Sequence, residues 1–143
     1  MIDANDVGTP EAVVDAVYRI LSGRAHEPRD WDGLSALCLP GARLYPVSVL
    51  DGVVVVETLD LESYARSRAP LLAARDFYEQ DIERRVEIAG NIAHIWSRYD
   101  ARQSPNGPLY MRGTGGFQLV QRDDRWWLVS AIWQADPESS PDY

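Results

Sequence analysis

The sequence contains no lysine, a single cysteine and two histidines, and these shortages exclude several kinds of chemistry. All 14 basic residues are arginines, so no lysine amine can form a Schiff base. Because Cys38 is alone, no intrachain disulfide can form. His26 and His94 lie far apart in the sequence, and neither has a cysteine or carboxylate at metal-ligand spacing. We therefore expect no metal site and no cofactor.

Long hydrophobic runs and an excess of positive charge are missing as well. The apolar runs are short, with Val53–Val56 among the longest, whereas a membrane helix needs about 20 apolar residues. The first residues lack the basic start of a signal peptide. A net charge of −8 opposes nucleic-acid binding, which needs a clustered basic face. We expect a cytoplasmic protein that binds neither membranes nor nucleic acids.

The length of 143 residues, with 45% hydrophobic and 25% charged residues, fits one globular domain over residues 1–143. No internal repeat and no long linker divides the chain. We expect the core at about 9–136 and a frayed tail at 137–143.

Helix signals lie in the first half of the chain. Thr9-Pro10 is a typical helix start, because threonine caps free amides and proline suits the first helical position. It predicts a helix over 10–22. Asp30 predicts a second, short helix that Pro40-Gly41 ends, and Asp60 predicts a third helix.

Strand signals fill the remaining chain. Asp51-Gly52 is typical of a two-residue hairpin turn, in which both residues need positive φ. It predicts strands at about 43–49 and 53–58. Turn residues then separate an antiparallel meander of four strands, near 76–89, 92–102, 109–122 and 125–135. The sequence thus predicts an α+β fold, in which a hairpin and a four-stranded meander form an antiparallel sheet against three helices.

Counting outward from the Gly90-Asn91 turn predicts which side chains of the first meander hairpin face the core. The core-facing pairs include Arg84 with Ser97, Ile82 with Tyr99 and Tyr78 with Gln103. A bulge in this long strand would move the residues beyond it to the opposite face.

The same counting from the Asp123-Asp124 turn makes both faces of the last hairpin apolar. It places Phe117 opposite Ser130 on the core face and Trp133 on the outer face. A sheet that is apolar on both sides must be covered on both sides, and three helices are too few for that. We therefore expect a homodimer through the outer face, which carries Trp96, Trp127, Trp133 and His94.

The order of helix, short helix, hairpin, helix and meander resembles the NTF2-like superfamily, and within it the SnoaL-like or DUF4440-like bacterial proteins. The resemblance covers about 9–136 and rests on this order, on the pattern at 90–97 and on the tryptophan-rich last strand at 125–134. It implies a cone of bent sheet wrapped around helices, with a cavity between the first helix and the sheet, and dimers are common in the superfamily. Its members include ketosteroid isomerases, polyketide cyclases, dehydratases, epoxide hydrolases and domains without known activity, so the fold alone does not give the function.

The isomerase-like pattern matches this chain only in part. Tyr18 corresponds to the tyrosine on the first helix. The general base should lie near 43–47, where no acidic residue occurs. Asp100 is the best match for the second acid, and the counted register places it on the outer face. The resemblance does not support steroid-type isomerisation.

The candidate ligand-binding residues are those expected to reach the cavity: Tyr18, Trp31, Tyr45, Arg84, Ser97, Tyr99, Ser130 and Gln134. For Arg84, pairing with a helix carboxylate such as Asp15 is an equally good interpretation. The tyrosines could also be core aromatics with their hydroxyls at an edge.

Three functions stay open from the sequence. The first is binding of a small apolar or aromatic molecule in the cone, without chemistry. The second is a cofactor-independent enzyme of the isomerase, dehydratase or polyketide-cyclase kind, in which Tyr99 and Arg84 polarise a carbonyl and Asp136 or a water molecule moves the proton. The third is a non-catalytic dimerisation scaffold whose cone is filled by its own aromatics, among them Trp31, Phe117 and Trp126.

Overall fold

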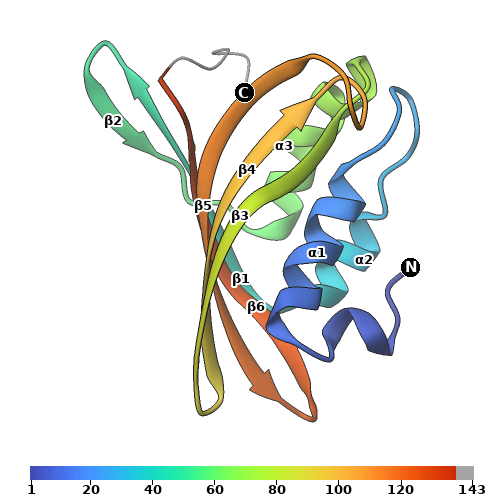
Figure 1. Cartoon of the computed structure of the whole chain (residues 1–143), viewed down its shortest axis with the longest axis vertical. Coiled ribbons are helices and arrows are strands. Elements are labelled where there is room, and N and C mark those ends of the chain that lie inside the picture. The colour runs from blue at the N-terminus through green and yellow to red at the C-terminus, as the bar shows by residue number, and fades with distance from the viewer. Residues whose placement is uncertain (138–143) are drawn as a thin grey trace.

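The computed structural model describes residues 1–137 and shows helices packed on one side of a strongly bent sheet (Figure 1). The elements in chain order are the 3-10 helix η1 (Ala4–Val7), α1 (Pro10–Leu21), α2 (Trp31–Leu37), β1 (Cys38–Leu50), β2 (Val53–Val56), α3 (Leu61–Ala74), β3 (Tyr78–Ala89), β4 (Ile92–Arg102), β5 (Leu109–Arg122) and β6 (Arg125–Ala135). The expected α+β cone is confirmed. Apart from Pro137, the predicted frayed tail lies outside the described residues. No helix within 1–137 is long and apolar enough to cross a membrane.

The predicted helix starts and turns are confirmed in atomic detail. The Thr9 hydroxyl accepts a hydrogen bond from the Ala12 amide at 3.0 Å at the start of α1. The side chains of Asp30 and Asp60 cap α2 and α3 in the same way. Asp51 and Gly52 have φ values of 51° and 79°, as the predicted hairpin turn requires.

The sheet has the strand order β2-β1-β6-β5-β4-β3. Neighbouring strands are antiparallel except β1 and β6, which pair in parallel. The sheet is therefore mixed, where the sequence predicted antiparallel pairing alone. This pairing joins two distant parts of the chain, so no local turn signal could have indicated it.

Two element boundaries differ from the sequence prediction. The helix α2 ends at Leu37, before Pro40-Gly41, and β1 begins at Cys38 rather than near 43. The pairing of β1 with β6 is irregular between Cys38 and Arg43, and Gly41 has a φ of 87° there. Proline and glycine are therefore accommodated within a bulged strand start, which is one of the places in a sheet that tolerates them.

One extra residue in β3 changes which of its side chains face the helices. Asp81 pairs with Tyr99, and Glu83 pairs with Arg98, so Ile82 has no partner of its own. The predicted pairing of Ile82 with Tyr99 is wrong, because the bulge points Ile82 outward with 48% of its surface exposed. Tyr78 pairs with Arg102 rather than with the predicted Gln103 for the same reason.

A second extra residue, Val129 in β6, reverses the faces of the last strand. Leu119 pairs with Leu128, as predicted. The next pair is Gln118 with Ser130, whereas the sequence predicted Phe117 as the partner of Ser130. The predicted position of Trp133 on the outer face is therefore wrong. Trp133 faces the helices and packs edge-on against Tyr64 of α3, with ring centroids 5.7 Å apart.

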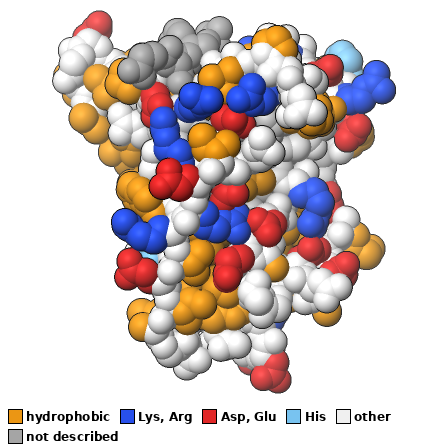
Figure 2. All heavy atoms as spheres, viewed as in Figure 1, with side chains coloured by type: hydrophobic (Ala, Val, Ile, Leu, Met, Phe, Trp, Pro, Cys, Tyr) orange, Lys and Arg blue, Asp and Glu red, His pale blue; other side chains and the backbone are white. Residues whose placement is uncertain are grey.

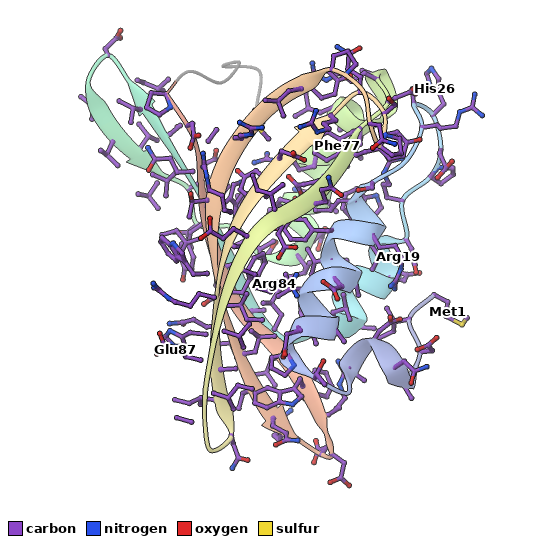
Figure 3. The ribbon with its side chains drawn as sticks, in the orientation of Figure 1. Met1, Arg19, His26, Phe77, Arg84 and Glu87 are labelled. Carbon is purple, nitrogen blue, oxygen red and sulfur yellow. The ribbon has the colours of Figure 1, made fainter. Side chains whose placement is uncertain are left out.

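Arg84 ties β3 to α1 on the helix side of the sheet, whereas Glu87 lies on the opposite side (Figure 3). The Arg84 guanidinium pairs with Asp15 of α1 at 2.7 Å and, through Nε, with Asp81 on β3. The structural interpretation of Arg84, pairing with a helix carboxylate, is therefore the one observed. Because the Arg84 side chain is only 18% exposed, its loss would leave the partly buried Asp81 carboxylate without a cation.

We expect Arg84→Met to lower the free energy of unfolding by about 2 kcal/mol, because it removes a charged hydrogen-bond partner from a partly buried acid. Arg24→Met is the matched control, since Arg24 is exposed, and we expect it to stay within about 0.5 kcal/mol of the wild type. Urea unfolding measures both. Equal stabilities of the two variants would show that the ion pairs of Arg84 contribute nothing.

Candidate functional site

A cavity lies between the helices and the concave face of the sheet. It is lined by residues from α1, α2, α3 and five of the strands, and most of them are aliphatic or aromatic. Its volume is about 70 Å³, counted as space open to the centres of water molecules. At about 10–15 Å³ for one such centre, the cavity accommodates a small molecule rather than a single water. The polar side chains in its wall are Tyr18, Tyr64, Glu79 and Tyr99, with the thiol of Cys38.

Glu79 of β3 is the acidic residue of this cavity. Burial among apolar side chains raises the pKa of its carboxyl to about 8, although the nearby Arg68 guanidinium acts in the opposite direction. Its backbone is fixed by Ser22, whose hydroxyl accepts from the Glu79 amide at 2.9 Å and lies at the end of α1. A carboxyl with a pKa near neutrality can both accept and donate a proton under physiological conditions.

The sequence analysis missed Glu79 because its register was counted without the bulge. With Ile82 inserted, the residues before it change face, and Glu79 comes to face the helices. The signal available in the sequence was the length of the predicted strand, which leaves room for a bulge, but β1 and β5 are longer still, so length alone does not locate one.

Tyr99 of β4 supplies a hydroxyl that has no hydrogen-bond partner among residues 1–137, although it is buried. Burial raises the pKa of this hydroxyl well above its ordinary value, so it stays protonated and can donate. Gly113 on the neighbouring strand makes room for it, because a Cβ there would lie 2.3 Å from the Tyr99 oxygen. A buried donor without a partner lowers the stability of a folded protein, so its presence here indicates a binding site for an acceptor.

Tyr18 of α1, in contrast, is already satisfied. Its hydroxyl lies 2.7 Å from the Ser97 hydroxyl, which in turn lies 3.5 Å from Asp81. This series of polar contacts continues from Asp81 through Arg84 to Asp15 at the surface. Protein groups therefore hold the Tyr18 hydroxyl, whereas the Tyr99 hydroxyl is left for a ligand.

The structure brings four of the predicted site residues, Tyr18, Arg84, Ser97 and Tyr99, to the concave side, and of these Tyr18 and Tyr99 line the cavity. Trp31 packs edge-on against Tyr64 with ring centroids 6.3 Å apart, and is not part of the cavity wall. Phe117 lines the cavity, and Trp126 is buried in the core.

The other predicted site residues do not line the cavity. Ser130 and Gln134 lie on the opposite face of the sheet, because the Val129 bulge reverses the register of β6. Tyr45 lies on that face as well, because Leu44 beside it in β1 faces the core. Asp136 makes two hydrogen bonds with Arg98, at 2.6 and 2.8 Å. These bonds lower the pKa of Asp136, so it stays ionised and paired, which does not suit a proton carrier. Arg84 is held by Asp15 and Asp81 as described above.

The acidic, histidine and cysteine side chains of the described residues form neither a metal site nor a reactive thiolate. No three His, Cys, Asp or Glu side chains within 1–137 come together as a metal site would need. Cys38 lines the cavity, but burial raises the pKa of its thiol to about 12, so it is not a reactive thiolate at neutral pH.

The convex face of the sheet, the side turned away from the helices, carries a second feature. A hollow of about 390 Å³ is lined by Tyr45, Trp96 and Ile132 together with Arg85, Glu87 and His94. Trp96 and Ile132 are 52% and 47% exposed. Trp127 lies on this face too, with the Arg125 guanidinium 3.6 Å above its ring.

No family model and no curated protein sequence matches the chain. Solved structures do match it. A Nostoc punctiforme protein of unknown function with a cystatin-like fold matches with a TM-score of 0.67 and 10% identity, over 94% of this chain and 98% of that one. A Streptomyces avermitilis protein, provisionally described as a dehydratase from the NTF2-like family, matches with a TM-score of 0.61 and 17% identity, over 88% and 93%. A Parabacteroides distasonis protein, provisionally described as a ketosteroid isomerase, matches with a TM-score of 0.60 and 13% identity, over 96% and 95%.

These likenesses confirm that the chain has the NTF2-like, cystatin-like fold that the sequence resemblance implied. At such low identity they establish the fold and not the reaction. The finer resemblance to SnoaL-like or DUF4440-like proteins stays a prediction.

The raised pKa of Glu79 predicts a pH-dependent stability. Its carboxyl ionises near pH 4.5 in the unfolded chain and near 8 in the folded protein, so the folded state loses stability as the pH rises between these values. We expect Glu79→Gln to become more stable than the wild type by up to about 1.4 kcal/mol for each pH unit across this window. Urea unfolding at a series of pH values measures the difference. Glu83→Gln, on an exposed position of the same strand, is the control, and parallel curves for wild type and Glu79→Gln would contradict the burial of this carboxyl.

Proposed function

We propose that the protein binds a small, largely apolar molecule with a carbonyl or hydroxyl oxygen, and moves a proton on it without a cofactor. The observation that supports this function is the placement of the Glu79 carboxyl in the same apolar wall as the unpartnered Tyr99 hydroxyl. An acid–base group and a free donor in one apolar cavity are what proton transfer next to a carbonyl needs. Glu79 thus takes the role that the sequence analysis considered for Asp136.

The proton transfer can be written in two steps. Ionised Glu79 accepts a proton from the carbon next to the ligand carbonyl, and the electron pair of that C–H bond forms a C=C bond while negative charge moves to the oxygen. The Tyr99 hydroxyl donates a hydrogen bond to this oxygen. Protonated Glu79 then returns the proton, to another carbon in an isomerisation or to a departing hydroxyl in a dehydration.

The similar structures are consistent with this class of reaction. Two of them carry provisional descriptions as a dehydratase and a ketosteroid isomerase, and both reactions move protons at carbon. The relation to this chain is one of fold, so the residues that carry the proposal are its own Glu79 and Tyr99.

Hydrogen–deuterium exchange of a simple ketone tests the proposal. With cyclohexanone in D₂O, we expect the wild type to accelerate exchange of the protons next to the carbonyl, followed by proton NMR. Glu79→Gln should lower the rate by about 100-fold or more, and Tyr99→Phe by about 10- to 100-fold. The rate should rise with pH as Glu79 ionises and level off above about 8.

Glu83→Gln, which changes an exposed acid on the same strand, is the control and should exchange at the wild-type rate. Cyclohexanone that shifts the NMR signals of Tyr18 and Tyr99 without catalysed exchange would overturn the enzymatic proposal in favour of binding alone. Exchange that survives in Glu79→Gln would exclude Glu79 as the proton carrier.

We also propose that the protein forms a homodimer through the convex face. The end of the β1–β2 hairpin stands away from the other strands (Figure 1) and is covered by apolar side chains (Figure 2). These exposed residues are Val49, Leu50, Val53, Val54 and Val56. One chain thus presents both a projecting apolar hairpin and the apolar hollow around Trp96. Arg85 and Glu87 also line this hollow and pair with each other at 3.7 Å, so their charges are balanced within one chain. The exposed apolar side chains are therefore the surface that a second copy related by a twofold axis would cover.

We expect the wild type to sediment as a dimer at micromolar concentration and Trp96→Glu to sediment as a monomer, because a charge at the centre of an apolar interface is not compensated. Leu71→Glu, an exposed apolar position on α3, is the control and should leave the dimer intact. A monomeric wild type in sedimentation velocity would contradict this proposal. The cytoplasmic location stays a prediction.

A further inference from the structure

Arg68 of α3 lies at a second, smaller hollow that adjoins the cavity. This hollow measures about 40 Å³, again as space for the centres of water molecules. It shares five of its wall residues with the cavity, and they include Glu79 and Tyr99. Of these two spaces, Arg68 lines only the smaller hollow. The wall residues that both spaces share connect it to the proposed reacting groups, Glu79 and Tyr99.

The Arg68 guanidinium is held in place by uncharged groups. It lies 5.2 Å from the centre of the Tyr64 ring and donates a hydrogen bond to the Ser67 hydroxyl at 3.0 Å. No carboxylate of residues 1–137 lies within ion-pair distance of it. The cation–π contact with Tyr64 fixes the direction of the side chain without neutralising its charge.

Two partly buried arginines of the sheet have an acid as partner. Arg84 pairs with Asp15 and Asp81, and Arg98 pairs with Asp136. Arg29 and Arg125 also lack an acid partner, but both donate to backbone carbonyls, as in the bonds from Arg29 to Leu21 and from Arg125 to Ala36. The Arg68 guanidinium donates to the Ser67 hydroxyl alone among the hydrogen bonds of residues 1–137, so it keeps donors for a ligand.

We propose that the ligand of this cavity is a small carboxylic acid whose carboxylate binds Arg68 and whose carbonyl or hydroxyl group lies at Glu79 and Tyr99. The inference rests on the proposed function and adds the substrate class to it. The planar guanidinium matches a carboxylate by two parallel hydrogen bonds. Arg68 is the one cationic side chain among the residues that line the smaller hollow, so it matches the single charge of a carboxylate better than the greater charge of a phosphate. The apolar middle of the ligand would lie against Tyr64 and Trp133, which both spaces share.

A matched pair of probes tests this inference. The probes are 4-oxocyclohexane-1-carboxylate and its uncharged carboxamide, which differ little in shape and share the ketone. Calorimetric titration gives the dissociation constant of each. We expect the wild type to bind the acid at least about 10-fold more tightly than the amide, because a charge-assisted bidentate pair is stronger than a neutral hydrogen bond.

Arg68→Gln should remove the preference for the acid, and Arg68→Lys should keep part of it. Arg66→Gln, which changes an exposed arginine on the same helix, is the control and should keep all of it. Equal affinity of the wild type for both probes, a preference that survives in Arg68→Gln, or no binding of either probe would each overturn the inference.

The two proposals can fail separately. If the wild type does not accelerate the exchange of cyclohexanone protons, the proton-transfer function is overturned, whatever its preference for the acid probe. A protein that exchanges cyclohexanone protons through Glu79 but shows no preference for the acid would keep the function and lose only the substrate class. Glu79→Gln should leave the preference itself in place, because Arg68 and not Glu79 recognises the carboxylate.

Discussion

The inserted residues in β3 and β6 determine which side chains meet inside this protein. Because side chains alternate along a strand, one extra residue moves all those beyond it to the opposite face. The insertion of Ile82 turns Asp81 and Glu79 toward the helices, and the insertion of Val129 turns Trp133 inward. The acid of the cavity, part of its aromatic wall and the ion pairs that join β3 to α1 all depend on these two positions.

The surroundings give three carboxyls of the sheet three different roles. Asp136 is bonded to Arg98 and stays ionised, whereas Asp81 joins the ion pairs of Arg84. Glu79 has apolar neighbours, and burial raises its pKa to about 8. The same contrast separates the tyrosines, because Tyr18 is bonded to Ser97 and Tyr99 has no partner within 1–137. The proposed chemistry uses the carboxyl whose pKa burial raises and the tyrosine hydroxyl that has no partner within 1–137.

Sequence reasoning succeeded where a signal is local. The caps at Thr9, Asp30 and Asp60 and the turn at Asp51-Gly52 act within a few residues, so their chemistry can be read without knowing the fold. Register counted from a turn was also correct up to the next bulge, as the pairing of Arg84 with Ser97 shows. Ser97 and Tyr99 were placed on the concave side for this reason, whereas Tyr18 was placed by the predicted first helix.

The sequence by itself therefore determined the helices, the hairpins, the α+β class and the NTF2-like order of elements. Only the tertiary structure decided the parallel pairing of β1 with β6, the bulges at Ile82 and Val129 and, through the first of these, the position of Glu79. The physical reason is that a cap or turn is stabilised by its immediate neighbours. A bulge is stabilised by how a whole bent sheet packs on its helices, and the pKa of a carboxyl depends on groups that come near it only after folding.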